Sequence, residues 1–137
     1  KAVSELDNEV CKSDIIITTT PAVLPLFADG LVRAGTHVTA IGADSPGKQE
    51  LPLGLVTSAS LRVCDLARQS LNHGEFQTAI KTDPALKVTE LGHILSGEHS
   101  GRLSNDDITV ADLTGIAAQD IAITQAIIDA ATAKNKT

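Results

Sequence analysis

An acid and a base stand four residues apart in the turn over residues 42–51, namely Asp44 and Lys48. Side chains of these types can exchange protons with a substrate and stabilise charge on it. Lys48 either pairs with Asp44 and lowers the pKa of its carboxyl or is a solvated turn lysine. Because Asp, Ser, Pro and Gly are also ordinary turn residues, the segment judged alone fits a surface turn equally well.

The segment before this turn, residues 37–41, is rich in β-branched residues and predicts a strand. Residues 14–20 form a continuous apolar and β-branched run, which predicts a strand buried on both faces of a parallel sheet. Residues 61–64 and 108–112 predict two more strands. Ligands of open α/β sheets bind outside the carboxyl ends of the strands, so the acidic turn lies where chemistry is expected.

Helical periodicity predicts an amphipathic helix in residues 1–12, a helix at 66–73 with Asp65 as its N-cap, and a short one at 88–96. Residues 22–34 are only weakly helical, and residues 51–59 read as a connector. A final helix over 116–131 has an apolar face that we expect to pack on the sheet or on other protein. Strands alternating with long connections predict an α/β fold with a parallel sheet.

Composition excludes several classes of partner. The net charge of −6 and the presence of only two aromatic residues argue against nucleic acid. Polar residues interrupt the most apolar stretch, 116–131, which predicts a soluble, cytoplasmic protein with no membrane partner. Cys11 and Cys64 are predicted to be buried free thiols. The four histidines have no ligand spacing, so we expect surface or capping roles and no metal site.

A dinucleotide-binding sheet would carry a GxGxxG turn after its first strand, and none of the ten glycines has this spacing. Either the domain binds no dinucleotide, or its first βαβ half precedes Lys1. The chain starts without Met and without an apolar signal region, so we expect an internal piece of a longer protein or a processed product.

Several segments together resemble the ornithine cyclodeaminase/μ-crystallin family. They are Ser-Asp-Ile-Ile-Ile-Thr-Thr-Thr-Pro at 13–21, Gly-Ala-Asp-Ser-Pro-Gly-Lys-Gln-Glu-Leu at 42–51, Thr-Glu-Leu-Gly at 89–92 and Asp-Leu-Thr-Gly-Ile-Ala-Ala-Gln-Asp at 112–120. The order and spacing also match, from about residue 13 to residue 130. The Asp-x-Pro-Gly-Lys turn is the most specific of these elements.

The resemblance implies a homodimeric NAD- or NADP-dependent protein of which this chain is the C-terminal part. Residues 1–115 would be the second half of a Rossmann-like, doubly wound parallel sheet, and residues 116–137 a helix returning toward a substrate and dimerisation domain. In the family, the acid of the turn faces the amino or imino group of the substrate, a position that Asp44 occupies here. The family's glycine fingerprint and its substrate-carboxylate-binding Lys and Arg precede this chain.

Candidate site residues follow from that placement. Asp44 is the predicted catalytic residue, because a carboxylate can take a proton from an amine and stabilise an iminium cation. Lys48 is the predicted substrate-binding residue. The predicted cofactor-binding residues stand at strand ends, where packing or turn roles are the alternative: Thr18, Thr19, Thr20, Gly42, Ala43, Thr114 and Gly115.

The predicted activity is ornithine cyclodeamination, in which hydride leaves an amino-acid Cα for the nicotinamide and later returns. Alanine dehydrogenase and ketimine or pyrroline-carboxylate reductase remain alternatives, with a small amino or imino acid as substrate. A non-catalytic μ-crystallin-type binding protein is an alternative of a different class, against which the retained Asp44 argues. The 137 residues by themselves are expected to be inactive.

Overall fold

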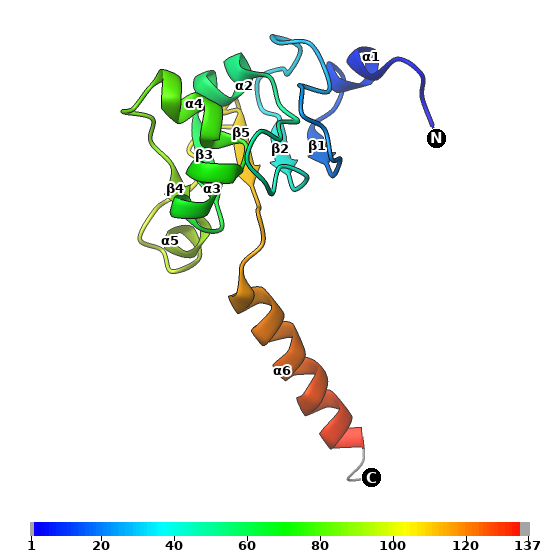
Figure 1. The fold of residues 1–137 in the computed structure, drawn as a ribbon, viewed down its shortest axis with the longest axis vertical. Helices are drawn as coiled ribbons and strands as arrows, with labels where there is room; N and C mark the ends of the chain where they lie inside the picture. Colours follow the sequence, from blue (N-terminus) through cyan, green and yellow to red (C-terminus); the bar gives the residue numbers. More distant parts are fainter. Residues whose placement is uncertain (1, 135–137) are drawn as a thin grey trace.

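A computed structural model describes residues 2–134 of the chain. Its centre is one five-stranded sheet in the order β1-β2-β5-β3-β4, and every pairing is parallel, which confirms the predicted fold class. Figure 1 shows the sheet with its helices and one long helix leading away from it. The strands are β1 (Ile15–Thr18), β2 (His37–Ala40), β3 (Leu61–Cys64), β4 (Thr89–Glu90) and β5 (Thr109–Asp112).

The strand register aligns the last residue of every strand at one edge of the sheet. Thr18 pairs with Ala40, and Ala40 with Asp112. Asp112 pairs in turn with Cys64, and Cys64 with Glu90. The loops that follow β1, β2 and β5 therefore leave the sheet side by side.

One face of the sheet carries the hydrophobic core. Val38, Ala40 and Val110 alternate along β2 and β5 with residues of the other sheet face and are fully buried. They pack with side chains of α2 (Leu53–Ser58) and α4 (Phe76–Thr82). The buried core residues are Val10, Phe27, Val38, Ala40, Leu51, Leu55, Val56, Ala59, Cys64, Phe76, Ala79 and Val110.

The opposite face is only partly covered. Ile15 and Ile17 of β1 are 65% and 64% exposed, so the prediction that both faces of this strand are buried is wrong for the described residues. The reason is that β1 is an edge strand whose outer face has no helix over it. Farther along this face, α5 (Leu91–Leu95) and the loop around Arg102 border a hollow of about 370 Å³ above β2, β5 and β3.

Two predictions about single residues are corrected. His37 is not a surface or capping residue, because it lies half-buried on that second sheet face, where its Nδ1 is 2.7 Å from Thr109 Oγ1. Burial and the nearby Arg102 lower the pKa of His37. Cys11 is exposed just after α1 (Leu6–Val10), whereas Cys64 is buried as predicted.

The helices differ in detail from the predicted ones. α3 (Ala67–His73) ends at Gly74 as predicted, but α2 lies in the presumed connector and α4 was not predicted. In α2, Gly54 and the polar pair Thr57 and Ser58 weaken the helical signal, and packing against the core decides the conformation. Residues 88–96 divide into β4 and α5, and residues 22–34 contain no helix.

The last helix, α6 (Ala117–Lys134), leads away from the sheet, and its described side chains are exposed (Figure 1). Ile121, Ile123, Ile127 and Ile128 are each more than half exposed. Of the two expected packing partners for this helix, the sheet is therefore excluded. The sequence predicts one segment over residues 1–115 and a second over residues 116–137. Residue 1 of the first and residues 135–137 of the second lie outside the described residues.

Candidate active site

Three loops bring the predicted site residues to one edge of the sheet. Residues 18–20 end β1, residues 42–48 follow β2, and residues 114–115 follow β5. β1 and β5 both pair with β2, so the acidic turn lies between the other two loops. This is the arrangement in which open α/β sheets bind ligands.

Asp44 and Lys48 form an ion pair at this edge. The Lys48 ammonium donates to Asp44 Oδ1 at 2.6 Å, and the Ser45 hydroxyl donates to the same oxygen at 3.1 Å. These hydrogen bonds, that of Lys48 first, hold the pKa of Asp44 below its usual value. The alternative of an unpaired, solvated Lys48 is thus removed. Because the Asp44 side chain is half exposed, its carboxylate remains open to a ligand.

Glu50 is a buried carboxylate that ties the ends of β1 and β2 together, and sequence reasoning missed it. Its two oxygens accept hydrogen bonds from the Thr18 hydroxyl at 2.7 Å, the Thr20 hydroxyl at 2.8 Å and the Gly42 amide at 2.9 Å, and also from the Thr20 amide. Burial by itself would raise the pKa of Glu50, but these hydrogen bonds together lower it. An acid directly before the apolar Leu51 was the only signal in the sequence.

The predicted cofactor-binding threonines differ in exposure. The hydroxyls of Thr18 and Thr20 donate hydrogen bonds to the Glu50 carboxylate, whereas the Thr19 side chain is exposed. Gly42 has no room for a side chain, since a Cβ there would lie 2.0 Å from the Thr20 carbonyl oxygen. Ala43 is buried, so its side chain packs inward. Thr19 therefore has the only exposed side chain among these β1 and β2 positions.

Asp65 holds the loop after β5 instead of capping α3. Its carboxylate accepts the Gly115 amide at 2.6 Å and the Thr114 hydroxyl at 3.1 Å. The α3 helix has no side-chain bond from its N-cap residue, and Glu90 accepts the Ala67 amide at 2.8 Å. The predicted N-cap is wrong because β3 and β5 are neighbours, which brings Asp65 to the β5 loop.

Two further buried acids lie behind the site, Glu75 and Asp112. Glu75 accepts the amides of Glu50 at 2.6 Å and Leu51 at 3.0 Å, and burial raises the pKa of Glu75 to about 7. Asp112 accepts the Ser70 hydroxyl and, at 3.0 Å, the Glu75 amide. Burial raises the pKa of Asp112 to about 6, and its Oδ1 has no hydrogen-bond partner among the described residues.

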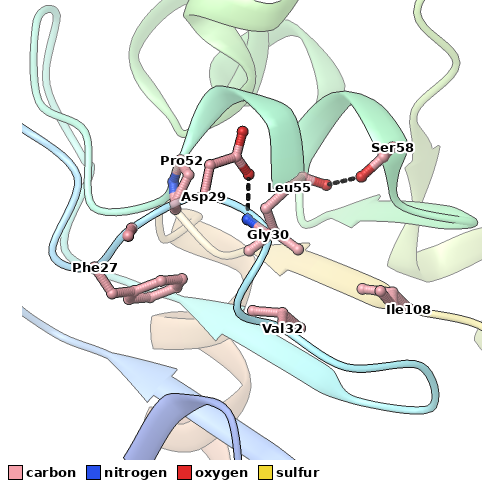
Figure 2. Close-up of a pocket in the computed structure, with 9 residues that line it drawn as sticks. Phe27, Asp29, Gly30, Val32, Pro52, Leu55, Ser58 and Ile108 are labelled. Carbon is pink, nitrogen blue, oxygen red and sulfur yellow. Dashed lines mark hydrogen bonds between the residues drawn. The ribbon is translucent and has the colours of Figure 1, made fainter. Parts of the chain in front are cut away.

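A small cavity beside α2 does not compete with this edge. This cavity has a volume of about 40 Å³, which is too small for an amino acid or a nucleotide. Its lining residues include Phe27, Leu55 and Ile108 (Figure 2). Within residues 2–134, no group of three His, Cys, Asp or Glu side chains could hold a metal ion. No described helix is long and apolar enough to span a membrane.

Comparison with known proteins points to one family. Residues 1–135 match the ornithine cyclodeaminase/mu-crystallin family. The chain is 37% identical over 132 residues to the alanine dehydrogenase of Archaeoglobus fulgidus, a match that covers 93% of this chain and 40% of that protein.

Solved structures give the same result. The iminosuccinate reductase of Paracoccus denitrificans in complex with NAD+ superposes with a TM-score of 0.89 at 35% identity, covering 98% of this chain and 42% of that one. An archaeal alanine dehydrogenase dimer with bound NAD gives a TM-score of 0.87 at 34% identity, covering 98% and 42%.

Similar proteins carry several related activities. They include alanine dehydrogenase, iminosuccinate reductase, Δ(1)-pyrroline-2-carboxylate reductase and a lysine cyclodeaminase. The chain spans about 40% of the length of the curated relatives it matches. With the family matched over nearly all of its residues, the chain belongs to the ornithine cyclodeaminase/mu-crystallin family.

Proposed function

We propose that this chain forms the hydride-transfer side of an NAD(P)-dependent enzyme that interconverts a small amino acid and its imine. The observation that carries the proposal is the exposed Asp44 carboxylate, ion-paired with Lys48 and held between the ends of β1 and β5. The similar proteins include a dehydrogenase, imine reductases and a cyclodeaminase, and reactions of this group have hydride transfer at the carbon that bears nitrogen in common.

The groups at this edge fit the nicotinamide end of the cofactor. Thr19 offers an exposed hydroxyl, and the loop of Thr114 and Gly115 borders the same edge. Lys48, the cation of the acidic turn, is engaged by Asp44 and so is a poor ligand for a diphosphate. An anionic side chain at this place suits a substrate nitrogen that carries positive charge. When bound, NAD(P) would supply the hydride acceptor or donor.

Asp44 acts on the nitrogen of the substrate. Its lowered pKa keeps the carboxylate ionised at neutral pH, so it accepts a hydrogen bond from the amine and orients it. As the carbon loses hydride, positive charge develops on the C=N unit, and the nearby carboxylate stabilises that charge. In the reductive direction the same carboxylate stabilises the protonated imine. Electrostatic stabilisation is therefore its main role, and proton exchange with the amine is secondary.

The specific reaction that the sequence favours, ornithine cyclodeamination, is one member of this class. There the side-chain amine attacks the C=N carbon, ammonia leaves, and the cyclic imine is reduced to proline. Reduction of small imino acids is the second candidate, and the similar iminosuccinate reductase and Δ(1)-pyrroline-2-carboxylate reductase, 36% and 35% identical to this chain, favour it. The A. fulgidus relative adds alanine dehydrogenation to the same group.

The domain organisation and the oligomeric state are proposed by analogy with those relatives. Residues 1–115 would be the second half of the cofactor domain, and residues 116–137 would reach toward a substrate and dimerisation domain. The archaeal alanine dehydrogenase is a dimer, and we propose a homodimer for this protein as well. We also expect the protein to be cytoplasmic. The grip on the substrate carboxylate would come from outside these 137 residues, which by themselves would be inactive.

A substrate panel tests the proposal. The full-length gene product is assayed for NADH or NADPH oxidation with Δ1-pyrroline-2-carboxylate, with pyruvate plus ammonia and with oxaloacetate plus ammonia. The reverse assay follows the conversion of ornithine to proline in the presence of NAD+ or NADP+. Turnover with at least one substrate supports the enzyme, and the preferred substrate separates cyclodeaminase, dehydrogenase and reductase.

The non-catalytic alternative gives a different result in the same panel. A crystallin-type protein would bind NAD(P)H, seen as a change in nicotinamide fluorescence, and would turn over none of these substrates. Cofactor binding without turnover across the panel would therefore contradict the proposed function.

A further inference from the structure

The acidic turn rests on the beginning of helix α4, a segment far from it in the sequence. Gln77, in the first turn of α4, is only 4% exposed. Its Oε1 accepts the Gly47 amide at 2.9 Å, and its Nε2 donates to the Lys48 carbonyl oxygen at 3.0 Å. One side chain thus holds the Gly47 amide and the Lys48 carbonyl oxygen, on either side of the Lys48 Cα.

The orientation of the Gln77 amide is fixed by its partners. Besides the Lys48 carbonyl, Nε2 donates to the Gly74 carbonyl oxygen at 3.0 Å, so both of its N–H groups point at acceptors. Reversing the amide would place its oxygen against two carbonyl oxygens. Gln77 therefore has the geometry of a two-sided clamp on the turn.

The neighbouring Glu75 holds the turn farther along the chain. This fully buried carboxylate accepts the amides of Glu50 and Leu51, as described above. Gln77 and Glu75 together therefore bind four backbone atoms between Gly47 and Leu51, which are three amide nitrogens and one carbonyl oxygen. The Asp44 side chain stays 53% exposed and that of Lys48 27% exposed.

The Gln77 clamp acts on Lys48, the residue whose ammonium binds the Asp44 carboxylate and lowers its pKa. Gln77 fixes the Lys48 carbonyl and the preceding Gly47 amide, and the Lys48 ammonium lies 2.6 Å from Asp44 Oδ1. Gly47 has a φ of +84°, a left-handed conformation that lets the chain turn just before Lys48. A shift of this backbone would move the ammonium off the carboxylate.

We propose that Gln77 is a positioning residue for the reaction, which holds Lys48 on Asp44 so that the carboxylate faces the substrate nitrogen. The inference rests on the proposed function, since it assigns Gln77 a task at the same site. Gln77 touches neither substrate nor cofactor and acts through the turn. A displacement of about 1 Å in a reacting group can cost about a hundredfold in rate, so loss of the clamp is expected to be large.

The test compares Gln77→Met and Gln77→Asn with Val56→Ala in the full-length gene product. Methionine fills the same space without hydrogen bonds, and asparagine is one methylene too short to reach both peptide groups. Val56 is a fully buried core residue of α2 that makes no hydrogen bond to the turn with its side chain, so its truncation controls for lost stability. Should Gln77→Met not fold, Gln77→Asn decides the result.

Amino-acid oxidation by NAD(P)+ is the first measurement. We expect kcat to fall about 10- to 100-fold in the Gln77 variants, with the KM for NAD(P)+ within about twofold of wild type. The acid limb of the pH profile should move to higher pH, because Asp44 without Lys48 titrates nearer its ordinary range. Val56→Ala should change neither kcat nor the limb. Gln77 variants that behave like Val56→Ala would overturn the proposal.

A second measurement does not depend on activity. The pKa of the Asp44 carboxyl is followed by carbon NMR in protein labelled at aspartate, in wild type and in both Gln77 variants. An upward shift in the variants supports the clamp, and an unchanged value overturns it. A wild-type protein that binds cofactor but turns over nothing would instead refute the proposed function, so the two failures are distinguishable.

Discussion

The Glu50 carboxylate accepts the Thr18 hydroxyl at 2.7 Å, although the two residues belong to different segments and are 32 positions apart. This bond closes the end of β1 onto the turn that follows β2. A charge that is fully buried is tolerated because its oxygens accept four hydrogen bonds. Glu50 thereby shapes the edge at which Asp44 is displayed.

The first prediction is that Glu50→Gln destabilises the fold by about 2–3 kcal/mol. The amide nitrogen of glutamine would face one backbone N–H and one threonine hydroxyl; the hydroxyl can rotate to accept, but the backbone N–H loses its acceptor. Urea unfolding measures the loss as a lower midpoint. Glu98→Gln, at an exposed acid, is the matched control and should change stability by less than about 0.5 kcal/mol. Equal midpoints for the two variants would contradict the role of Glu50.

The second prediction concerns Asp44 in the full-length gene product. Asp44→Asn keeps size and turn compatibility but removes the charge, so kcat should fall about 10²–10⁴-fold. Affinity for NAD(P) and the melting temperature should stay nearly unchanged, because the side chain is half exposed. Asp106→Asn, at an exposed acid in another loop, is the control. Activity within about threefold of wild type would make Asp44 only a turn residue.

The third prediction is a pH dependence of stability caused by Glu75. Its pKa of about 7 in the fold lies above the ordinary value of 4.5, so the folded state favours the protonated acid. The stabilisation is complete below about pH 4.5 and is lost as pH rises through about 7. Asp112, raised to about 6, acts in the same direction. His37, whose pKa is lowered, acts in the opposite direction below pH 6.5.

Comparison with Glu75→Gln isolates this effect. Between pH 5 and pH 8 the melting temperature of wild type should fall by several degrees relative to that of the variant. Glu5→Gln, at an exposed acid, should give a curve parallel to wild type in this range. A Glu75→Gln curve that also runs parallel would show that Glu75 titrates at its ordinary pKa.

The fourth prediction is that the 137 residues alone bind NAD(P) weakly or not at all. None of their glycines has the GxGxxG spacing that places a diphosphate at a helix N-terminus. Calorimetric titration of the isolated chain measures the affinity, with the full-length gene product as reference. Tight, stoichiometric binding by the isolated chain would show that its strand ends suffice for the cofactor.

The fifth prediction is that the isolated chain self-associates through α6. This helix carries four exposed isoleucines, and exposed apolar surface of this kind favours association. Sedimentation at increasing concentration should show oligomers that the double variant Ile121→Gln/Ile128→Gln reduces. Leu103→Gln, an exposed apolar residue in a loop, should leave association unchanged. A wild-type chain that stays monomeric at high concentration would contradict the prediction.

Much of the fold follows from local sequence pattern. The strands at 15–18, 37–40, 61–64 and 109–112 coincide closely with β-rich runs, because a parallel sheet needs branched apolar side chains in short segments. The position of Asp44 after β2 also follows from the sequence, since the turn residues mark where that strand ends. The strand pairings of the structure confirm the predicted parallel sheet.

Only the tertiary structure decides what the sequence leaves open. The Lys48 pairing depends on how the turn closes, and the roles of Glu50, Glu75 and Gln77 depend on contacts between segments 25–32 residues apart. Asp65 has the sequence pattern of an N-cap, yet the adjacency of β3 and β5 directs it to Gly115. Local pattern reports a residue's own conformation, whereas the partner of a buried polar group is set by which strands become neighbours.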